Sequence, residues 1–234
     1  SATGAGGRRR VIAVCGVGED ACPDRVAVLV ASAAGGAGLR VVLVDAHGLG
    51  GIAAASGTRV AETAHVGWDE AIRSVRDGSP HGLIAALPLL RGMPVLAGSV
   101  RGTSSDERGR AVETLLGGCD VVVAALGCAD PSRWWDTTGS LGQCSEAPHQ
   151  IVAVGAGPLP GPAPQRPGVP IPDLVTVRGL GRAPDGPDTA ARLGAAWAGT
   201  VDVRTGRARG ATSRLMRRRW APRLAAGERL GWVA

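Results

Sequence analysis

Residues 39–51 read LRVVLVDAHGLGG, and this stretch decides the fold of the chain. Four consecutive apolar residues at 41–44 lead directly to Asp45, and glycines crowd the loop that follows. An apolar run without alternation is typical of a parallel strand that is covered on both faces. We therefore expect a buried strand over 39–45 that opens into a glycine-rich loop over 45–51.

The stretch upstream completes a β-α-β unit. Residues 10–16 read RVIAVCG, which predicts a second short buried strand that ends in a glycine turn. Residues 24–34 place Val26, Leu29 and Val30 on one side of a helix, and the glycine-rich run 35–38 ends it. Two such strands joined by a helix imply a right-handed crossover and a parallel sheet.

Strands and helices continue to alternate downstream. Apolar residues recur at helical spacing from Trp68, and Ser104 with Glu107 forms a capping-box pattern that opens a helix to Leu116. Further strands are expected at 93–98, 119–127, 150–155 and 173–177, and further helices at 68–77, 185–197 and 212–226. This order predicts an α/β fold, with a doubly wound, mostly parallel sheet and helices on both faces.

The composition divides the chain into three parts. Residues 1–8 read as a flexible leader, and 9–199 as one α/β domain. A proline-rich insertion at 156–172 interrupts that domain, with seven prolines between 158 and 172. The last part, 200–234, is a basic tail with nine arginines against two carboxylates.

Several chemistries are excluded by what the chain lacks. All 26 basic residues are arginine, and Lys, Tyr and Phe are absent. A Schiff-base lysine, a lysine on a nucleotide phosphate and tyrosine-dependent hydride transfer are therefore impossible. The five cysteines form no C-x-x-C pair and the four histidines are scattered, so no metal is expected. The same cysteine usage favours a reducing, cytoplasmic location, with attachment to the inner face of the membrane as an extension.

Three predicted strands with their following loops carry a family resemblance. The unit from residue 9, the LRVVLVDAHGLGG stretch and residues 118–127 (GCDVVVAALG) resemble the ParA/MinD group of P-loop ATPases. More narrowly, they resemble actinobacterial CpaE/TadZ-like and septum-site-determining relatives. The resemblance covers roughly residues 9–155 and implies a P-loop NTPase-like three-layer sandwich. It also implies an ATP or ADP site with Mg²⁺, in which Gly16 and Gly18 belong to the phosphate loop and Asp45 lies near the attacking water.

The phosphate loop departs from that family pattern. Pro23 and Asp24 stand where the family has its Ser/Thr pair, and Glu19 and Asp20 add carboxylates beside a triphosphate. The acidic residue expected near the end of strand 119–127 falls on Ala124 or Ala125. We therefore expect a degenerate nucleotide site, formed by Gly16, Gly18, Asp24 and Asp45, with no catalytic residue and no bound cofactor.

These observations favour a non-catalytic pseudo-ATPase that acts as a scaffold or localisation factor. The resemblance implies a setting in pilus or secretion assembly or in division-site placement, with a protein partner or a homodimer.

An alternative is a nucleotide- or dinucleotide-binding enzyme, because Gly16, Gly18 and Ala21 also match a dinucleotide fingerprint. Within the candidate loops, His47 is interpreted as a solvated histidine, and Asp45 as a relic or a cap of the glycine loop.

The basic tail offers a second candidate surface. Arg214, Arg217, Arg218, Arg219 and Trp220 lie in the predicted helix 212–226, and are expected to face a partner or an anionic membrane. The resemblance supports the membrane reading, since MinD-like relatives carry a C-terminal membrane-targeting helix. Two alternatives stay open: the arginines hold nucleic-acid phosphates, or the helix docks on the sheet through Met216, Trp220 and Leu224.

Overall fold

The computed structural model describes residues 9–17, 21–47, 51–52, 67–77, 79–129, 149–155, 171–178, 185–202 and 211–231. Gly18, the leader at 1–8 and most of the proline-rich insertion lie outside these residues. Within the described part, eight strands form one sheet in the order β3-β4-β2-β5-β1-β6-β7-β8. Their bounds are β1 Arg10–Val17, β2 Val41–Asp45, β3 Leu89–Leu90, β4 Met93–Leu96, β5 Val121–Ala129, β6 His149–Gly155, β7 Asp173–Arg178 and β8 Ala196–Asp202.

The central strands are parallel and start level with one another. Val121 of β5 is the register partner of both Arg10 in β1 and Val41 in β2. Each pair of neighbouring strands is parallel except β3 and β4, which form a short antiparallel pair at one edge. The predicted doubly wound, mostly parallel sheet is therefore confirmed.

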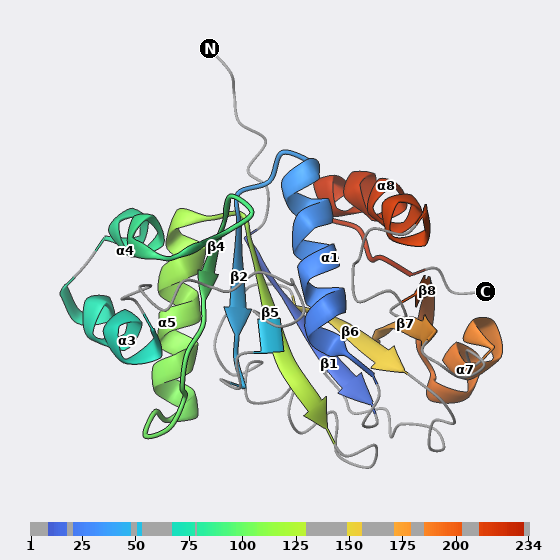
Figure 1. Cartoon of the computed structure of the whole chain (residues 1–234), viewed down its shortest axis with the longest axis horizontal. Coiled ribbons are helices and arrows are strands. Elements are labelled where there is room, and N and C mark those ends of the chain that lie inside the picture. Colours follow the sequence, from blue (N-terminus) through green and yellow to red (C-terminus); the bar gives the residue numbers. More distant parts are fainter. Residues whose placement is uncertain are drawn as a thin grey trace.

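Helices cover both faces of the sheet (Figure 1). Their bounds are α1 Pro23–Gly36, α3 Trp68–Asp77, α4 Pro80–Ala86, α5 Ser105–Gly118, α7 Gly186–Leu193 and α8 Ala211–Ala226. Residues of α1 and α8 share one buried cluster with the strands, and residues of α3, α4, α5 and α7 share the other. The sheet is the middle of three layers, each held by apolar burial.

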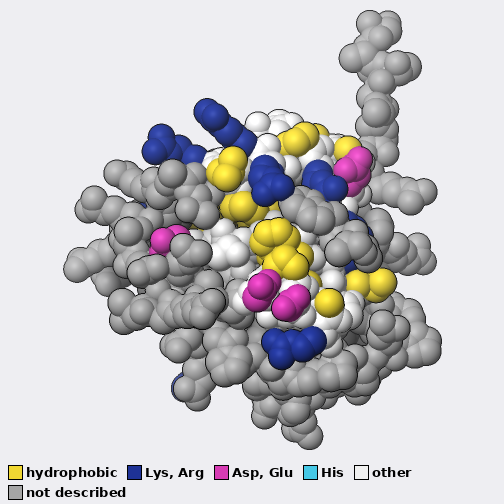
Figure 2. All heavy atoms as spheres, turned by 90° about the vertical axis from the view of Figure 1, so that its right-hand side faces the viewer, with side chains coloured by type: hydrophobic (Ala, Val, Ile, Leu, Met, Phe, Trp, Pro, Cys, Tyr) yellow, Lys and Arg dark blue, Asp and Glu magenta, His cyan; other side chains and the backbone are white. Residues whose placement is uncertain are grey.

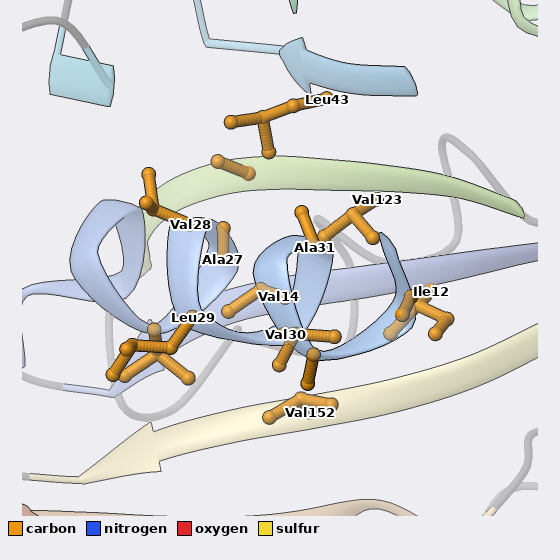
Figure 3. Close-up of a cluster of buried hydrophobic side chains, with 14 of the residues drawn as sticks. Ile12, Val14, Ala27, Val28, Leu29, Val30, Ala31, Leu43, Val123 and Val152 are labelled. Atoms are coloured by element: carbon orange, nitrogen blue, oxygen red, sulfur yellow. The ribbon is translucent and has the colours of Figure 1, made fainter. Parts of the chain in front are cut away.

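Helix α1 lies closely on the centre of the sheet because its buried side is made of small residues. Figure 3 shows Ala27, Val30 and Ala31 of α1 among side chains of β1, β5 and β6. The one aromatic residue among the described members of this cluster is Trp220 of α8, which agrees with a composition without Phe or Tyr. Alanine adds little side-chain bulk, so the helix backbone approaches the strands.

The predicted capping box at the start of α5 is confirmed. Ser104 Oγ accepts from the backbone N–H of Glu107 at 3.2 Å, and Glu107 accepts from the backbone N–H of Ser104 at 2.9 Å. The helix continues through Gly117 and Gly118 rather than ending before them. A Cβ at Gly117 would lie 2.8 Å from Pro80 Cγ, so these glycines let α5 pack against α4.

The prediction of a helix over 185–197 is wrong for residues 194–197. Helix α7 ends at Leu193, because Gly194 adopts the left-handed conformation with φ 62°. Trp197 lies instead in β8, a strand that the sequence analysis missed along with α4 and β3. Strand β8 pairs with β7 and runs across the boundary predicted between residues 199 and 200.

Helix α8 packs its apolar residues into the body of the protein. Met216 and Leu224 are buried, and Trp220 is 0% exposed and donates from Nε1 to the carbonyl of Ala198 at 3.2 Å. The placement of Trp220 on a partner or membrane surface is therefore wrong, and the docked alternative is what the structure contains. No described helix has the length and apolar character that crossing a bilayer requires.

The segment that follows α8 is tied to the sheet by a buried carboxylate. Asp173 is 0% exposed and accepts from Gln150, from Arg229 at 3.1 Å, and from the backbone N–H groups of Leu230 and Gly231. Arg223 donates to the carbonyls of residues 229, 230 and 231 at 2.8 to 3.0 Å. We call this arrangement the C-terminal clamp.

Replacing Asp173 by Ala should open the C-terminal clamp. The change leaves Arg229 and two buried backbone N–H groups without their acceptor, so we expect the free energy of unfolding to fall by about 3 kcal/mol. Urea denaturation followed by circular dichroism measures this. Glu113→Gln, an exposed change on α5, is the control and should stay within about 0.5 kcal/mol of wild type. A similarly small loss for Asp173→Ala would contradict the clamp.

Candidate functional site

Three parallel strands end at the same edge of the sheet, and the predicted site residues lie there. Gly16 is near the end of β1, Asp45 ends β2, and Cys128 is near the end of β5. Helix α1 begins at this edge and brings Asp24. The structure thus places Gly16, Asp24 and Asp45 at one edge of the sheet together with Cys128, whereas Gly18 lies outside the described residues.

Gly16 allows the turn into α1 to pack against β5. A Cβ at this position would lie 2.8 Å from Cys128 Sγ, 3.0 Å from Ala21 Cβ and 3.1 Å from Pro23 Cδ. Such distances leave no room for any larger residue unless a neighbour moves. The pairing of β1 with β5 also shifts register between Val14 and Gly16. Gly16 therefore has a steric role at the site, whatever the site binds.

The start of α1 turns its backbone toward a thiol of the same chain. Cys22 precedes the helix in the left-handed conformation, with φ 49°, and Pro23 opens the first turn. Burial, followed by the nearby charges of Asp24 and Cys22, raises the pKa of Cys128. Hydrogen bonds from the backbone N–H groups of Ala21 and Cys22 to its sulfur act in the opposite direction. Since the pKa is raised on balance, Cys128 is not an activated nucleophile at neutral pH.

His47 bridges two carboxylates at the centre of the site. Its Nε2 lies 3.2 Å from Asp24 Oδ1 and 3.6 Å from Asp45 Oδ1. The Asp45 side chain is fully buried, and those of Asp24 and His47 are largely buried. The interpretation of His47 as a solvated loop histidine is therefore wrong. We call Asp24, His47 and Asp45 the carboxylate–histidine bridge.

Two glycines make room for this bridge. Gly127 has φ +74°, and a Cβ there would lie 3.0 Å from His47 Cγ, so the imidazole rests on a position without a side chain. A Cβ on Gly51 would overlap the carboxylate of Asp24. Gly127 lies within β5 and Gly51 follows β2, and the absence of a side chain at these two positions is the signal in the sequence that a bulky group approaches the backbone.

The two carboxylates of the bridge favour the charged form of His47. The hydrogen bond to Asp24 raises the pKa of His47, and the charges of Asp45 and Asp24 add to this against the effect of burial. His47 Nδ1 is buried without a hydrogen-bond partner among the described residues. The contacts that favour a charged imidazole are therefore those that Nε2 makes with the two carboxylates. A protonated His47 between two carboxylates is the arrangement that Coulomb interactions favour.

Neighbouring elements hold the loop that carries the bridge. Trp68 of α3 donates from Nε1 to the carbonyl of Asp45 at 2.9 Å. Arg108 of α5 donates to the carbonyl of Ala46 at 3.2 Å, and the N–H of Ala46 bonds to the carbonyl of Ala125 at 2.9 Å. The first residues after β2 are thus fixed from three sides.

The acidic residue that the family resemblance implies on β5 is absent. Ala124 and Ala125 occupy these positions and are completely buried. In the part of the chain that the structure describes, no group of His, Cys, Asp and Glu side chains is arranged to hold a metal ion.

A solved structure shares this architecture. The crystal structure of a ParA family ATPase from Chlorobium tepidum matches with a TM-score of 0.62 and covers 92% of this chain and 98% of that chain. The fold is ParA-like. The two sequences are 10% identical, so the match speaks for the fold alone. No family model and no curated protein matches the sequence.

The arginines of α8 divide into exposed and half-buried side chains. Arg214, Arg218 and Arg219 are exposed, whereas Arg217 is half-buried against the body. Figure 2 shows arginine side chains in dark blue gathered near the upper edge of one face, where α8 lies. The predicted basic surface is therefore present without Trp220.

Replacing His47 by Gln should reduce stability more at low pH than at high pH. A raised pKa in the folded state stabilises the fold fully below the ordinary value of 6.5, and this contribution is lost as the pH rises through the folded pKa. The difference in unfolding free energy between wild type and His47→Gln should therefore be larger at pH 5.5 than at pH 8.5, by denaturant titration. His81→Gln, an exposed change on α4, should show no such difference. A gap that is constant with pH would refute the charged bridge.

Proposed function

We propose that the chain is a non-catalytic, ParA/MinD-like pseudo-ATPase that works as a scaffold or localisation factor through protein–protein contacts. The observation that carries the proposal is the carboxylate–histidine bridge. It lies between the start of α1 and the end of β2, which is where the family resemblance implies phosphate and Mg²⁺. In this proposal the chain keeps the fold of a nucleotide switch, and its own charged side chains occupy the position of the nucleotide phosphates and Mg²⁺.

The start of α1 is poorly suited to phosphate. A phosphate loop offers several backbone N–H groups and the positive end of a helix to the anion. Pro23 has no N–H, and the N–H groups of Ala21 and Cys22 are directed at Cys128. Asp24 adds a carboxylate in the first turn, which repels a phosphate oxygen in a largely buried site.

The same residues do not suit Mg²⁺ beside a nucleotide. Mg²⁺ takes hard oxygen ligands in near-octahedral geometry, and the family's hydroxyl and second acidic positions are held here by Asp24 and alanine. His47 places a cation between Asp24 and Asp45, so a divalent ion would have to break two contacts at 3.2 and 3.6 Å. The residues present therefore fit the bridge and not the metal nucleotide.

A scaffold also needs a surface for its partner. Helix α8 presents Arg214, Arg218 and Arg219 to solvent, and the C-terminal clamp keeps this helix in place. On the other side of α8, Met216, Trp220 and Leu224 are buried in the core. These features support a fixed docking surface over a detachable membrane arm. The resemblance suggests pilus or secretion assembly, or division-site placement, as the setting.

Calorimetric titration of the full chain with ATP and Mg²⁺ tests the proposal. We expect no saturable heat of binding at nucleotide concentrations up to about 1 mM, because the carboxylate–histidine bridge occupies the position that the phosphates would need. Micromolar binding, or ATP hydrolysis that Asp45→Ala abolishes, would overturn it.

A double variant tests whether the start of α1 is the obstacle. Pro23→Ser with Asp24→Thr restores one backbone N–H and two hydroxyls, and removes the carboxylate that faces the site. We expect this variant to bind ATP with Mg²⁺ where the wild type does not. If the variant shows no heat of ATP binding while circular dichroism shows that it is folded, Pro23 and Asp24 are not the reason why the wild type does not bind ATP.

A further inference from the structure

We propose that a groove at the amino end of the sheet binds an acidic, amphipathic helical segment of a partner protein. The groove encloses about 760 Å³ and is lined by Val41 and Val42 at the start of β2, far from Asp45 at the end of that strand. Its walls come from the second half of α1, from α4, from the β3–β4 hairpin and from Arg217 of α8. We call it the amino-end groove.

The floor of the amino-end groove is apolar. Side chains from four elements and the loop after α1 contribute to it: Val28, Ala31, Leu39, Ile84, Leu90 and Met93. A concave apolar surface of this kind is a common feature of a binding groove.

A smaller groove continues from it between α1 and α8. It encloses about 260 Å³, with Ser32, Ala33 and Gly36 on the α1 side and Arg214, Arg217 and Arg218 on the α8 side. Ser32, Gly36 and Arg217 line both grooves, so the two form one channel. Three arginines therefore meet at one end of an apolar floor.

The charge of this channel is not balanced by its own lining. Among the described residues that line either groove there is no Asp or Glu. Arg40 at the rim pairs with Asp120 at 2.7 Å, Arg91 of the β3–β4 hairpin also lines the larger groove, and three arginines of α8 line the smaller one. Arg217 Nε is buried and has no hydrogen-bond partner in the described structure. Buried donors are nearly always satisfied, which points to an acceptor brought by a ligand.

These features together favour a peptide over a membrane or a nucleic acid. An apolar floor calls for apolar side chains, and three arginines at one end call for carboxylates, which an acidic amphipathic helix supplies at once. A membrane contact would need several apolar side chains that protrude from α8, but only Leu215 among the described apolar residues Leu215, Met216, Trp220 and Leu224 is exposed, and the other three are buried. Nucleic acid would use the arginines and leave the floor empty.

The inference goes beyond the proposed function, because the channel lies at the other end of the sheet from the carboxylate–histidine bridge. It would stand even if the chain bound ATP. Conversely, a failure of peptide binding would leave the nucleotide experiments unaffected.

Fluorescence anisotropy with a designed peptide tests the inference on the full chain. The probe is a fluorescein-labelled helix of about 16 residues, with leucines at i, i+3, i+7 and i+10 and glutamates elsewhere. We expect saturable binding with a Kd of about 10 μM that weakens with salt. The same peptide with lysine in place of glutamate should not bind.

Two variants distinguish binding in this channel from nonspecific binding of the peptide. A Cβ at Gly36 meets no atom within 4 Å, so Gly36→Leu fills the channel without disturbing the fold. We expect it, and separately the pair Arg214→Ala with Arg218→Ala, to weaken binding at least about tenfold. Arg192→Ala, an exposed change on α7, is the charge control and should bind like the wild type.

The inference is overturned if the acidic peptide does not bind the wild type, or if Gly36→Leu binds it equally well. It is also overturned if phosphatidylglycerol vesicles or duplex DNA bind through Arg214 and Arg218 and displace the peptide, since the partner is then a membrane or a nucleic acid.

Discussion

The parallel register of β2, β5 and β1 determines what the two ends of this protein can do. Because Val41, Val121 and Arg10 start level, the carboxyl ends of the three strands lie at one edge, where Asp45 and Gly16 are found on either side of β5. The amino ends gather at the opposite edge, where β2 opens the channel beside α1 and α8. One sheet thus carries two separate candidate sites, and α1 extends from one to the other.

At the carboxyl edge, the fold imposes a cost that the sequence must meet. A fully buried Asp45 and a largely buried Asp24 would repel each other, and each would lose hydration. In a nucleotide switch, a metal and backbone N–H groups balance such charges. His47 takes over this balancing role here, and it fits only because Gly127 and Gly51 leave space beside it. The buried carboxylates of this edge are therefore accommodated by groups of the chain itself.

The sequence predicts the β-α-β unit well because local patterns determine it. Patterns of only a few residues indicate these elements: the apolar run at 41–44, the glycine turn at Gly16 and the capping box at Ser104. The errors concern residues whose place depends on distant partners. Trp197 looks like a member of a helix face but lies in a strand, and Trp220 lies in the expected helix but is buried and donates to Ala198 rather than facing a partner or a membrane. Likewise, nothing near His47 in the sequence indicates that Asp24, on another element, lies 3.2 Å away.

The exclusive use of arginine gains a structural reason from the C-terminal clamp. Arg223 reaches three consecutive carbonyls, and Arg229 meets Asp173 through two of its nitrogens. The three contacts of Arg223 are all made by Nη1, whereas the pair of contacts from Arg229 uses the planar donor set of a guanidinium, which the point charge of an ammonium group does not offer. Since these contacts hold α8 against α1 and β8, Arg214, Arg217 and Arg218 stand at fixed positions along one channel. A preorganised set of cations loses less entropy when it binds than arginines on a free tail would. The charge that composition alone assigns to a tail is therefore built into a wall of the folded domain.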